Sequence, residues 1–380
     1  MLRKVLVIFV TLGALSYLCT LYYYSLLSQD RLHSPVGTHG EIKSPHRTTV
    51  HIVGKAAIAD FLWFHILEGT VIEEANGFYR TGSIESDRFT FKFLSGPGYI
   101  QTTIPRNIEY LVLILNGRSD DKKQAALLWL DYLNVLTNLK GVGIVLLGDE
   151  QCQNDWILKY MRKHGGIIDV LFVVYDWKLV DNEDIFQWPL GVATYRGFPV
   201  VKDVSVDDSP RKHLCNFVGT VYKNSSRSRL KQLVEDGQFP FNCVSHVRLK
   251  WLANEPTESL QKYINILENS DFTLCPVGRN TECYRIYEAL SFGSIPVIED
   301  VRTDGQCSSP LRLLKEYNAP FVYLDNWDLL SSSLGNLTDT RGQVAKLRNQ
   351  NILWYKSFKL WIRGKFIRVL ENKFLFQSGA

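Results

Sequence analysis

The sequence predicts an α/β fold made of two doubly wound domains that face a cleft, and three observations lead to this prediction. Short, continuous apolar runs alternate along the chain with segments whose apolar residues recur at helical spacing, which is typical of a parallel sheet covered on both faces. The alternation stops at a polar link around residues 202–212 and then restarts. The chain has 380 residues, which is enough for about two domains of ordinary size.

The first half of the pattern contains four predicted strands and two predicted helices. The strands are VHIVG (50–54), YLVLILNG (110–117), GVGIVLLGDE (141–150) and DVLFVVYD (169–176), and the helices are AAIADFLWFHILEG (56–69) and KKQAALLWLDYLNVL (122–136). We expect these elements to form a first domain over residues 50–205. Its ligands would bind at the carboxyl ends of the strands, as they do in sheets of this kind.

The second half repeats the pattern over residues 206–380. Strands are predicted at LCNFVGT (214–220), DFTLCP (271–276), SIPVIED (294–300) and APFVYLD (319–325), and a helix is predicted to begin near Ser226. The last segment, residues 353–375, is amphipathic and basic. We expect it to be a helix that packs on the core and returns to the first domain, with contact to a membrane surface as the alternative.

The N-terminus carries a predicted membrane anchor. Residues 5–27 contain no charge and are long enough to cross a bilayer as a helix. Arg3 and Lys4 precede them, so the positive-inside rule places residues 1–4 in the cytosol and the rest of the chain in the lumen, as in a type II membrane protein. A cleaved signal peptide is the alternative, but it would have a shorter apolar region and an A-x-A site. Residues 28–49 are polar and contain proline and glycine, which is typical of a stem.

Two other features agree with a luminal position. The sequons at Asn224 and Asn336 are predicted glycosylation sites. Six of the seven cysteines follow the anchor, at positions Cys152, Cys215, Cys243, Cys275, Cys283 and Cys307. An oxidising compartment permits disulfides, but the sequence does not give their pairing, and a plain buried thiol is an equal alternative for each cysteine.

Charge and motif content exclude several classes of protein. The net charge of +4 is too small to predict a nucleic-acid partner, and the basic residues form no dense run. The sequence lacks the GxxxxGK[ST] loop, the G-x-S-x-G elbow and the HExxH motif, which argues against an NTPase, a serine hydrolase and a zinc protease. No D-x-D motif follows an apolar strand, so we expect a reaction that needs no metal ion.

The stretch CPVGRNTECYRIYEALSFGSIPVIED, residues 275–300, predicts the end of a strand, a loop, a helix and a second strand. Asn280 or Thr281 is expected to cap the helix and Gly293 to end it. Because the first turn of a helix has free N–H groups and a positive dipole end, this helix start suits a diphosphate.

One face of the predicted helix carries charge. Arg285 could bind a phosphate in a bidentate, charge-assisted contact. Glu282, Arg285 and Glu288 are spaced i, i+3, i+6 and would share a face, with Glu288 placed to accept hydrogen bonds from a ribose diol. The alternative is a surface helix on which the three residues form a ladder of ion pairs. Spacing alone does not decide between the two interpretations.

Several segments resemble a known family. RIYEALSFGSIPVI is similar to the donor-site segment of the exostosin-like glycosyltransferases, and HLCNFVGTVYKNSSRSRL is similar to the strand and glycine turn that open their second domain. Within that group, the longer segments GKAAIADFLWFHILEG, LVLILNGR, FQWPLGVATYRGFPVV, CNFVGTVYKNSSR and TLCPVGRNTECYRIYEA resemble the ribitol xylosyltransferase family. These segments occur in order across nearly the whole region after the stem.

The resemblance implies a fold and a reaction. It implies a GT-B fold of two Rossmann-like domains, in which residues 50–205 face the acceptor and residues 206–380 bind the nucleotide sugar. It implies an inverting enzyme of the Golgi membrane that transfers xylose from UDP-xylose to ribitol 5-phosphate on the O-mannosyl glycan of α-dystroglycan, alongside other transferases of the same pathway. The residues that match the donor-side motif are Gly219, Arg227, Gly278, Tyr284, Arg285 and Glu288.

Two alternative functions stay open at this point. The chain could be an exostosin-like transferase with a different UDP-sugar donor. It could also be a catalytically inactive protein of the Golgi that binds glycans or holds other transferases. The Arg285 and Glu288 pair argues against the second alternative, because an inactive site needs neither residue.

An inverting transfer needs a general base, and the first domain should supply it at the end of a strand. The leading candidates are Glu150 and Asp176, with Asp149, Asp60 and His65 as further options. Each of these groups could instead cap a helix or pair with a cation. Lys55 and Arg196 are candidates for binding an anionic acceptor, and Trp188 and Tyr195 could line the cleft, with ion pairing and packing as the alternatives.

Overall fold

The computed structural model describes residues 47–54, 56–206, 208–223, 225–250, 256–303, 305–338 and 342–376. Residues 47–380 form one compact unit. The predicted anchor, most of the predicted stem, Lys55 and Asn224 lie outside the described residues. Within the described ranges, no helix combines the length and the apolar character that a membrane crossing requires.

The first sheet has eight strands in the order β2-β3-β4-β1-β5-β6-β7-β8. The strands are β1 (Thr48–Gly54), β2 (Ile72–Glu74), β3 (Tyr79–Glu85), β4 (Phe89–Ser95), β5 (Tyr110–Asn116), β6 (Gly141–Leu147), β7 (Val170–Val174) and β8 (Ile185–Trp188). From β4 to β8 every neighbouring pair is parallel, whereas β3 runs antiparallel to both β2 and β4. The four strands predicted in this half are confirmed, and β1 begins inside the range predicted as stem.

The second sheet has five strands in the order β10-β9-β11-β12-β13, all parallel. The strands are β9 (His213–Thr220), β10 (Cys243–Arg248), β11 (Ser270–Cys275), β12 (Ile295–Glu299) and β13 (Val322–Leu324). Continuous apolar strands form where both faces of a sheet are covered, and β11 is buried along its whole length. The predicted α/β class with parallel sheets is therefore confirmed.

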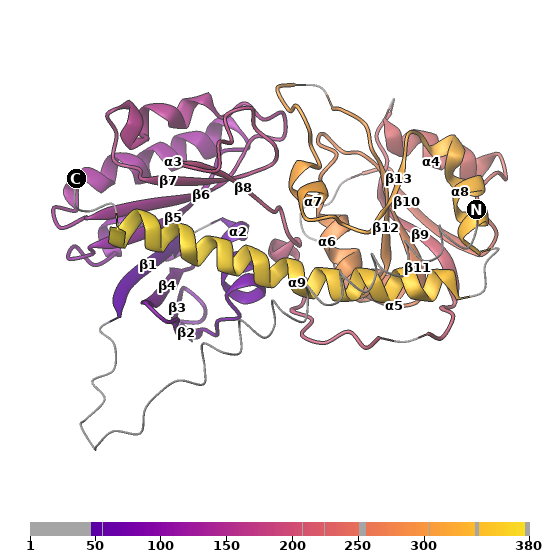
Figure 1. Ribbon diagram of the computed structural model, residues 1–380, viewed down its shortest axis with the longest axis horizontal. Helices are drawn as coiled ribbons and strands as arrows, with labels where there is room; N and C mark the ends of the chain where they lie inside the picture. The colour runs from indigo at the N-terminus through magenta and orange to yellow at the C-terminus, as the bar shows by residue number, and fades with distance from the viewer. Residues whose placement is uncertain are drawn as a thin grey trace, which may run out of the picture. The chain divides into compact units, whose positions relative to one another are not determined.

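Helices connect the strands and cover the sheets (Figure 1). In the first half they are α2 (Ala57–Asp60), η1 (Phe61–Ile66), η2 (Gln101–Thr103), α3 (Asp120–Tyr132), η3 (Leu133–Val135), η4 (Asp155–Tyr160), η5 (Arg162–His164) and η6 (Thr194–Arg196). In the second half they are α4 (Ser226–Glu235), α5 (Thr257–Glu268), α6 (Tyr284–Ser291), α7 (Arg312–Glu316), η7 (Trp327–Leu329) and α8 (Leu330–Thr338). Asn336 is exposed on α8, which suits a sequon.

The last helix, α9 (Gln343–Glu371), continues as η8 (Asn372–Phe376) and runs alongside both sheets (Figure 1). On the second half, Trp354 Nε1 donates to the carbonyl of Tyr317 at 2.6 Å. On the first half, Phe366 packs against Phe172 and Trp188. The helix begins ten residues before the predicted start at residue 353, and its apolar face is core.

Of the two disulfides in the described part of the chain, one joins two loop segments and the other joins two strands. Cys152–Cys307 joins the segment after β6 to the segment before α7, across 155 residues, and so links the two halves covalently. Cys215–Cys243 joins register partners of β9 and β10. Cys275 and Cys283 are free thiols.

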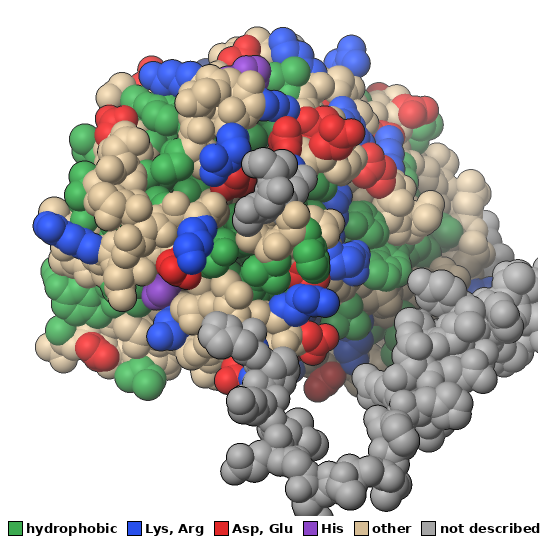
Figure 2. Space-filling model, turned by 60° about the vertical axis from the view of Figure 1, so that its left-hand side comes forward, with side chains coloured by type: hydrophobic (Ala, Val, Ile, Leu, Met, Phe, Trp, Pro, Cys, Tyr) green, Lys and Arg blue, Asp and Glu red, His purple; other side chains and the backbone are tan. Residues whose placement is uncertain are grey.

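That nucleic acid is no partner stays a prediction. On the face drawn in Figure 2, Lys and Arg side chains are scattered among acidic and apolar ones and form no continuous patch.

Candidate functional site

The helix at the centre of the candidate site begins later than predicted. α6 starts at Tyr284 with Cys283 as its N-cap, so Asn280 and Thr281 lie in the preceding loop. The Asn280 side chain accepts from the N–H of Glu282 at 2.9 Å and donates to the carbonyl of Glu150 at 2.9 Å. Asn280 therefore closes a turn and ties the loop to the first half of the chain, instead of capping the helix.

Because of this later start, the prediction that Glu282 shares a helix face with Arg285 and Glu288 is wrong. Glu282 is 2% exposed and lies before the helix. Its Oε1 accepts from the N–H of Leu190 at 3.0 Å and from the hydroxyl of Tyr287. Burial raises the pKa of Glu282 to about 7. Glu282 is a buried polar link between the halves, and this geometry gives it no direct access to a donor.

We expect Glu282→Gln to flatten the dependence of stability on pH. The folded pKa of about 7 lies above the ordinary value of 4.5, so the folded state holds the proton more tightly. The contribution of protonated Glu282 to the free energy of unfolding is therefore complete below about pH 4.5. It is lost as pH rises through 7, and the loss is on the order of 2–3 kcal/mol. Gln keeps the acceptor toward Leu190 and cannot ionise. Melting temperatures at pH 5, 6, 7 and 8 check this, and parallel curves for the two proteins would contradict it.

Two arginines and two glycines meet at the carboxyl end of β9. Arg285 Nη2 donates to the carbonyl of Val218 at 2.8 Å, and Arg227 Nη1 donates to the carbonyl of Thr220 at 3.0 Å. A Cβ at Gly219 would lie 2.6 Å from Arg285 Nη2, and a Cβ at Gly278 would lie 3.3 Å from Arg227 Nη2. The glycines therefore leave the space that the guanidinium groups occupy. These four predicted residues are brought together by the structure.

The two guanidinium groups are close enough to repel each other. Burial lowers the pKa of Arg227, and the charge of Arg285 lowers it further. Within the described part of the chain, no ion pair joins either arginine to a carboxylate. Two neighbouring cations at the carboxyl end of a parallel strand form an arrangement that an anion such as a diphosphate would stabilise.

Glu288 is buried beside this pair of arginines. Its Oε2 accepts from the hydroxyl of Tyr263 at 2.9 Å, and its Oε1 accepts from the N–H of Ala193 at 3.3 Å. Burial raises its pKa. The interpretation of this helix as a surface ladder of ion pairs is therefore wrong, because Glu282 and Glu288 are both buried and both bind the segment that follows β8.

Residues of the first half approach the same place. Glu150 follows β6, is a quarter exposed, and pairs with Arg118 at 2.5 Å. The ring of Tyr195 lies 5.8 Å from the ring of Tyr284, which is the first residue of α6. Burial raises the pKa of Tyr284, and the carboxylate of Glu150 adds to this rise. Glu150 also acts on the pKa of Arg227. Glu150 thus lies at the junction with the donor-side arginines.

Asp176, the second candidate base, is completely buried, and each of its oxygens has a partner, although Oδ1 has only an ion pair and no hydrogen bond. Its Oδ2 accepts from the N–H and hydroxyl of Ser308, both at 2.8 Å, and from the N–H of Ser309 at 2.7 Å. Its Oδ1 pairs with Arg312 at 2.7 Å. A carboxylate held in this way ties the halves together and has no oxygen directed at a substrate.

Most of the remaining predicted residues have structural roles, in ion pairs or in the core. Asp60 pairs with Arg80 at 2.9 Å. His65 is buried in η1, and burial followed by the charge of Lys359 lowers its pKa to about 4. Trp188 is a core residue. Arg196 lies over the ring of Tyr195, with 5.5 Å between its guanidinium carbon and the ring centroid. Arg196 and Tyr195 are therefore the two of this group that lie beside the site.

Sequence reasoning missed two residues of the site. Arg118 follows β5, so its position at the end of a strand was a usable signal. Cys283 gave no signal, because its neighbour Cys275 lies on another element. The hydrogen bond with Cys275 lowers the pKa of Cys283 to about 6 against the effect of burial, and the charges of Arg285 and Arg227 add to the effect.

We expect Cys283 to be the faster of the two free thiols to react. Its lowered pKa favours the reactive thiolate and it is partly exposed, whereas Cys275 is buried and burial raises its pKa. Iodoacetamide at pH 7, followed by peptide mass spectrometry, should show Cys283 modified first, and UDP should slow the reaction. Equal rates at the two cysteines would contradict this expectation. The Cys283→Ser variant identifies the peptide.

No metal centre is evident in the part of the chain that the structure describes, since no group of three or more His, Cys, Asp or Glu residues there is arranged to hold an ion. The independence from metal stays a prediction.

Comparison with known proteins identifies the family. Residues 50–189 match the model of the RXYLT1 N-terminal domain, and residues 195–375 match that of the RXYLT1 C-terminal domain. The chain belongs to the RXYLT1 family. A relative from Danio rerio, named ribitol-5-phosphate xylosyltransferase 1, is 44% identical over 340 residues, which cover 87% of this chain and 78% of that protein. The Homo sapiens relative of the same name is 41% identical over 343 residues, covering 87% and 77%.

Two solved structures show a distant likeness to this member of the RXYLT1 family. An α1,3-fucosyltransferase has a TM-score of 0.42 and 13% identity, covering 89% of this chain and 94% of that one. A GtfA/B complex has a TM-score of 0.40 and 9% identity, covering 69% and 57%. Both are too distant to bear on the chemistry of this chain.

Proposed function

We propose that this protein transfers xylose from UDP-xylose to ribitol 5-phosphate, with inversion at the anomeric carbon. The observation that carries the proposal is its identity of 41–44% with relatives named ribitol-5-phosphate xylosyltransferase 1, over 87–88% of the chain. The acceptor would be carried by the O-mannosyl glycan of α-dystroglycan. The enzyme would act in the Golgi lumen as a type II membrane protein, held by residues 5–27 and in the company of other transferases of the pathway.

We further propose a GT-B arrangement for the two halves. Residues 206–380, with the second sheet, would bind the nucleotide sugar, and residues 50–205, with the first sheet, would face the acceptor. The contacts of Asn280, Glu282 and Glu288 with the first half support a site shared by both halves, because they bring the start of α6 against the segments that follow β6 and β8.

The diphosphate of the donor would bind Arg285 and Arg227 at the carboxyl end of β9, with the first turn of α6 supplying N–H groups. Two fixed guanidinium groups stabilise the negative charge that develops on the leaving UDP. This is the task that a divalent cation performs in metal-dependent transferases, so the pair supports a metal-independent reaction. Glu288 would accept from the ribose, since each of its oxygens retains a lone pair.

Glu150 would take the proton from the attacking ribitol hydroxyl. Of the two leading candidates it is the one with a partly exposed carboxylate, and Arg118 holds one oxygen while the other has no partner in the described part of the chain. The acceptor phosphate would meet Arg196, which lies on the first half beside Tyr195, and Lys55.

Release of UDP tests this proposal. The full-length protein would be assayed with UDP-xylose, UDP-glucuronate and UDP-N-acetylglucosamine, each with and without a glycan capped by ribitol 5-phosphate. We expect release from UDP-xylose, and only with this acceptor. Better use of another donor would favour a different exostosin-like transferase. No release from any donor while UDP still binds would favour an inactive glycan-binding protein.

A further inference from the structure

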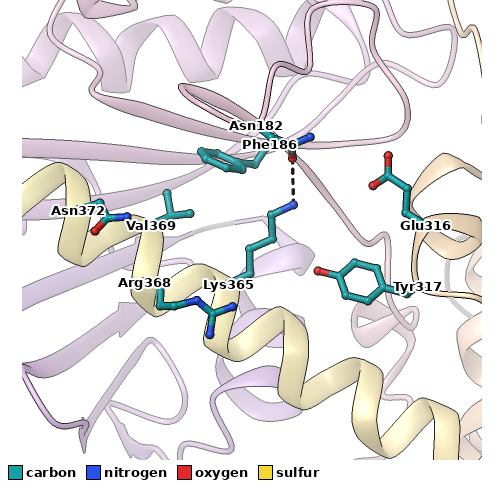
Figure 3. A pocket seen from close by; sticks show the side chains of 8 residues that line it. All are labelled: Asn182, Phe186, Glu316, Tyr317, Lys365, Arg368, Val369 and Asn372. Atoms are coloured by element: carbon teal, nitrogen blue, oxygen red, sulfur yellow. Dashed lines mark hydrogen bonds between the residues drawn. The ribbon is translucent and has the colours of Figure 1, made fainter. Parts of the chain in front are cut away.

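A cavity lies away from the candidate donor site. It has a volume of about 480 Å³, which is within the range of ligand pockets. Its walls come from the segment around the start of β8, the end of α7 and the last turns of α9 (Figure 3). The lining residues are Asn182, Phe186, Glu316, Tyr317, Lys365, Arg368, Val369 and Asn372. None of them belongs to the candidate donor site.

The wall formed by α9 is cationic. Lys365 and Arg368 are one turn apart on the helix and both line the cavity; Lys365 reaches toward Asn182, and Arg368 lies along α9 (Figure 3). Lys365 Nζ donates to Asn182 Oδ1 at 3.0 Å and lies 5.3 Å from the centroid of the Phe186 ring. Arg368 is exposed and forms no ion pair within the described part of the chain, and the same is true of Glu316 on the opposite wall. The cavity therefore has a net positive charge and a guanidinium group with open hydrogen-bonding positions.

The rest of the lining suits a carbohydrate. The ring of Tyr317 stacks on Trp361, with 5.5 Å between ring centroids, and is partly exposed. Rings of this kind cover the apolar face of a sugar, and the side-chain amides of Asn182 and Asn372 can bind hydroxyl groups. Arg368 can bind a phosphate or carboxylate in a bidentate contact. Size, charge and rings together fit a short anionic saccharide.

We propose that this cavity, which we call the α9 pocket, binds an anionic sugar unit of the glycan that carries the acceptor. The proposal rests on the proposed function, because an acceptor carried on a longer glycan extends past the reacting ribitol. Binding at the α9 pocket would raise affinity for the carried acceptor through a second point of attachment. It would leave the chemistry at the donor site unchanged.

Arg368→Ala tests the α9 pocket in kinetics. The side chain is exposed and without an ion pair, so its loss should leave the fold intact. We expect KM for the glycan-carried acceptor to rise about fivefold to tenfold, with kcat and KM for free ribitol 5-phosphate unchanged. Lys346→Ala is the matched control, an exposed cation on the same helix outside the pocket, and it should change neither constant. An unchanged KM for the carried acceptor in Arg368→Ala would overturn the proposal.

Direct binding separates this proposal from the proposed function. Isothermal titration of wild-type protein, in the absence of donor, would use two disaccharide probes that carry either a phosphate or a glucuronate group. Binding of one probe that Arg368→Ala weakens at least fivefold would support the pocket and identify the anion, even if no xylose transfer were found. Failure of both probes to bind, or equal binding to both proteins, would overturn the proposal, even if xylose transfer were intact.

Discussion

Arg285→Ala is expected to lower turnover of UDP-xylose by about 10²–10³-fold while the protein stays folded. Arg285 shares the carboxyl end of β9 with Arg227, and its removal leaves one guanidinium group to stabilise a leaving group of charge about −2 to −3. The loss should fall mainly on kcat, because the charge on the departing diphosphate grows in the transition state. Initial rates of UDP release over a range of donor concentrations measure it.

Two further variants make this result specific. Arg229→Ala removes an arginine two residues from Arg227 whose side chain pairs with Asp328 outside the site, and it should retain wild-type kinetics. Arg285→Lys keeps the positive charge but lacks the bidentate guanidinium group, so its turnover should fall between those of wild type and Arg285→Ala. Thermal melting of all three proteins shows whether the fold survives. Normal turnover in a folded Arg285→Ala protein would remove the role of this residue in binding the diphosphate.

The parallel strands could be predicted because their signal is local. β5, β6 and β7 are buried on both faces and therefore read as continuous apolar runs. β3 carries intermediate or exposed side chains throughout, and β2 is fully exposed. β3 pairs with β4, and β2 pairs only with β3 at the edge, so no run of apolar residues marks them. β2 and β3 were missed for this reason, whereas β4 was missed although its buried residues alternate along the strand.

The candidate site could be predicted only where a residue is recognisable from its own local segment of the sequence. Arg285 was predicted from its place near the start of a helix, and Arg227, Gly219 and Gly278 from the resemblance to the donor-side motif; the structure brings these four residues together. Glu282 failed because its partner Leu190 lies 92 residues earlier in the chain. The spacing of residues in the sequence could not reveal the burial of Glu282 or the later start of α6.

The two candidate bases are expected to respond differently to loss of charge. Glu150→Gln keeps the size of a partly exposed side chain and removes its ability to accept a proton, so kcat should fall by about 10²–10⁴-fold with little change in melting temperature. Asp176→Asn leaves Arg312 without its carboxylate in a buried setting. It should lower the free energy of unfolding by about 3–5 kcal/mol, while the folded fraction retains kcat.

Kinetics and melting of the same preparations separate the two roles. Asp155→Asn, at an exposed acid of the same segment after β6, is the control and should affect neither quantity. The opposite pattern, in which Asp176→Asn is stable and inactive and Glu150→Gln is active, would assign the base to Asp176. That result would require the Ser308–Ser309 segment to move during the reaction, because in this structure those donors and Arg312 occupy both oxygens of Asp176. Asp176 would have to release these contacts before it could reach a substrate hydroxyl, and so we expect the base to be Glu150.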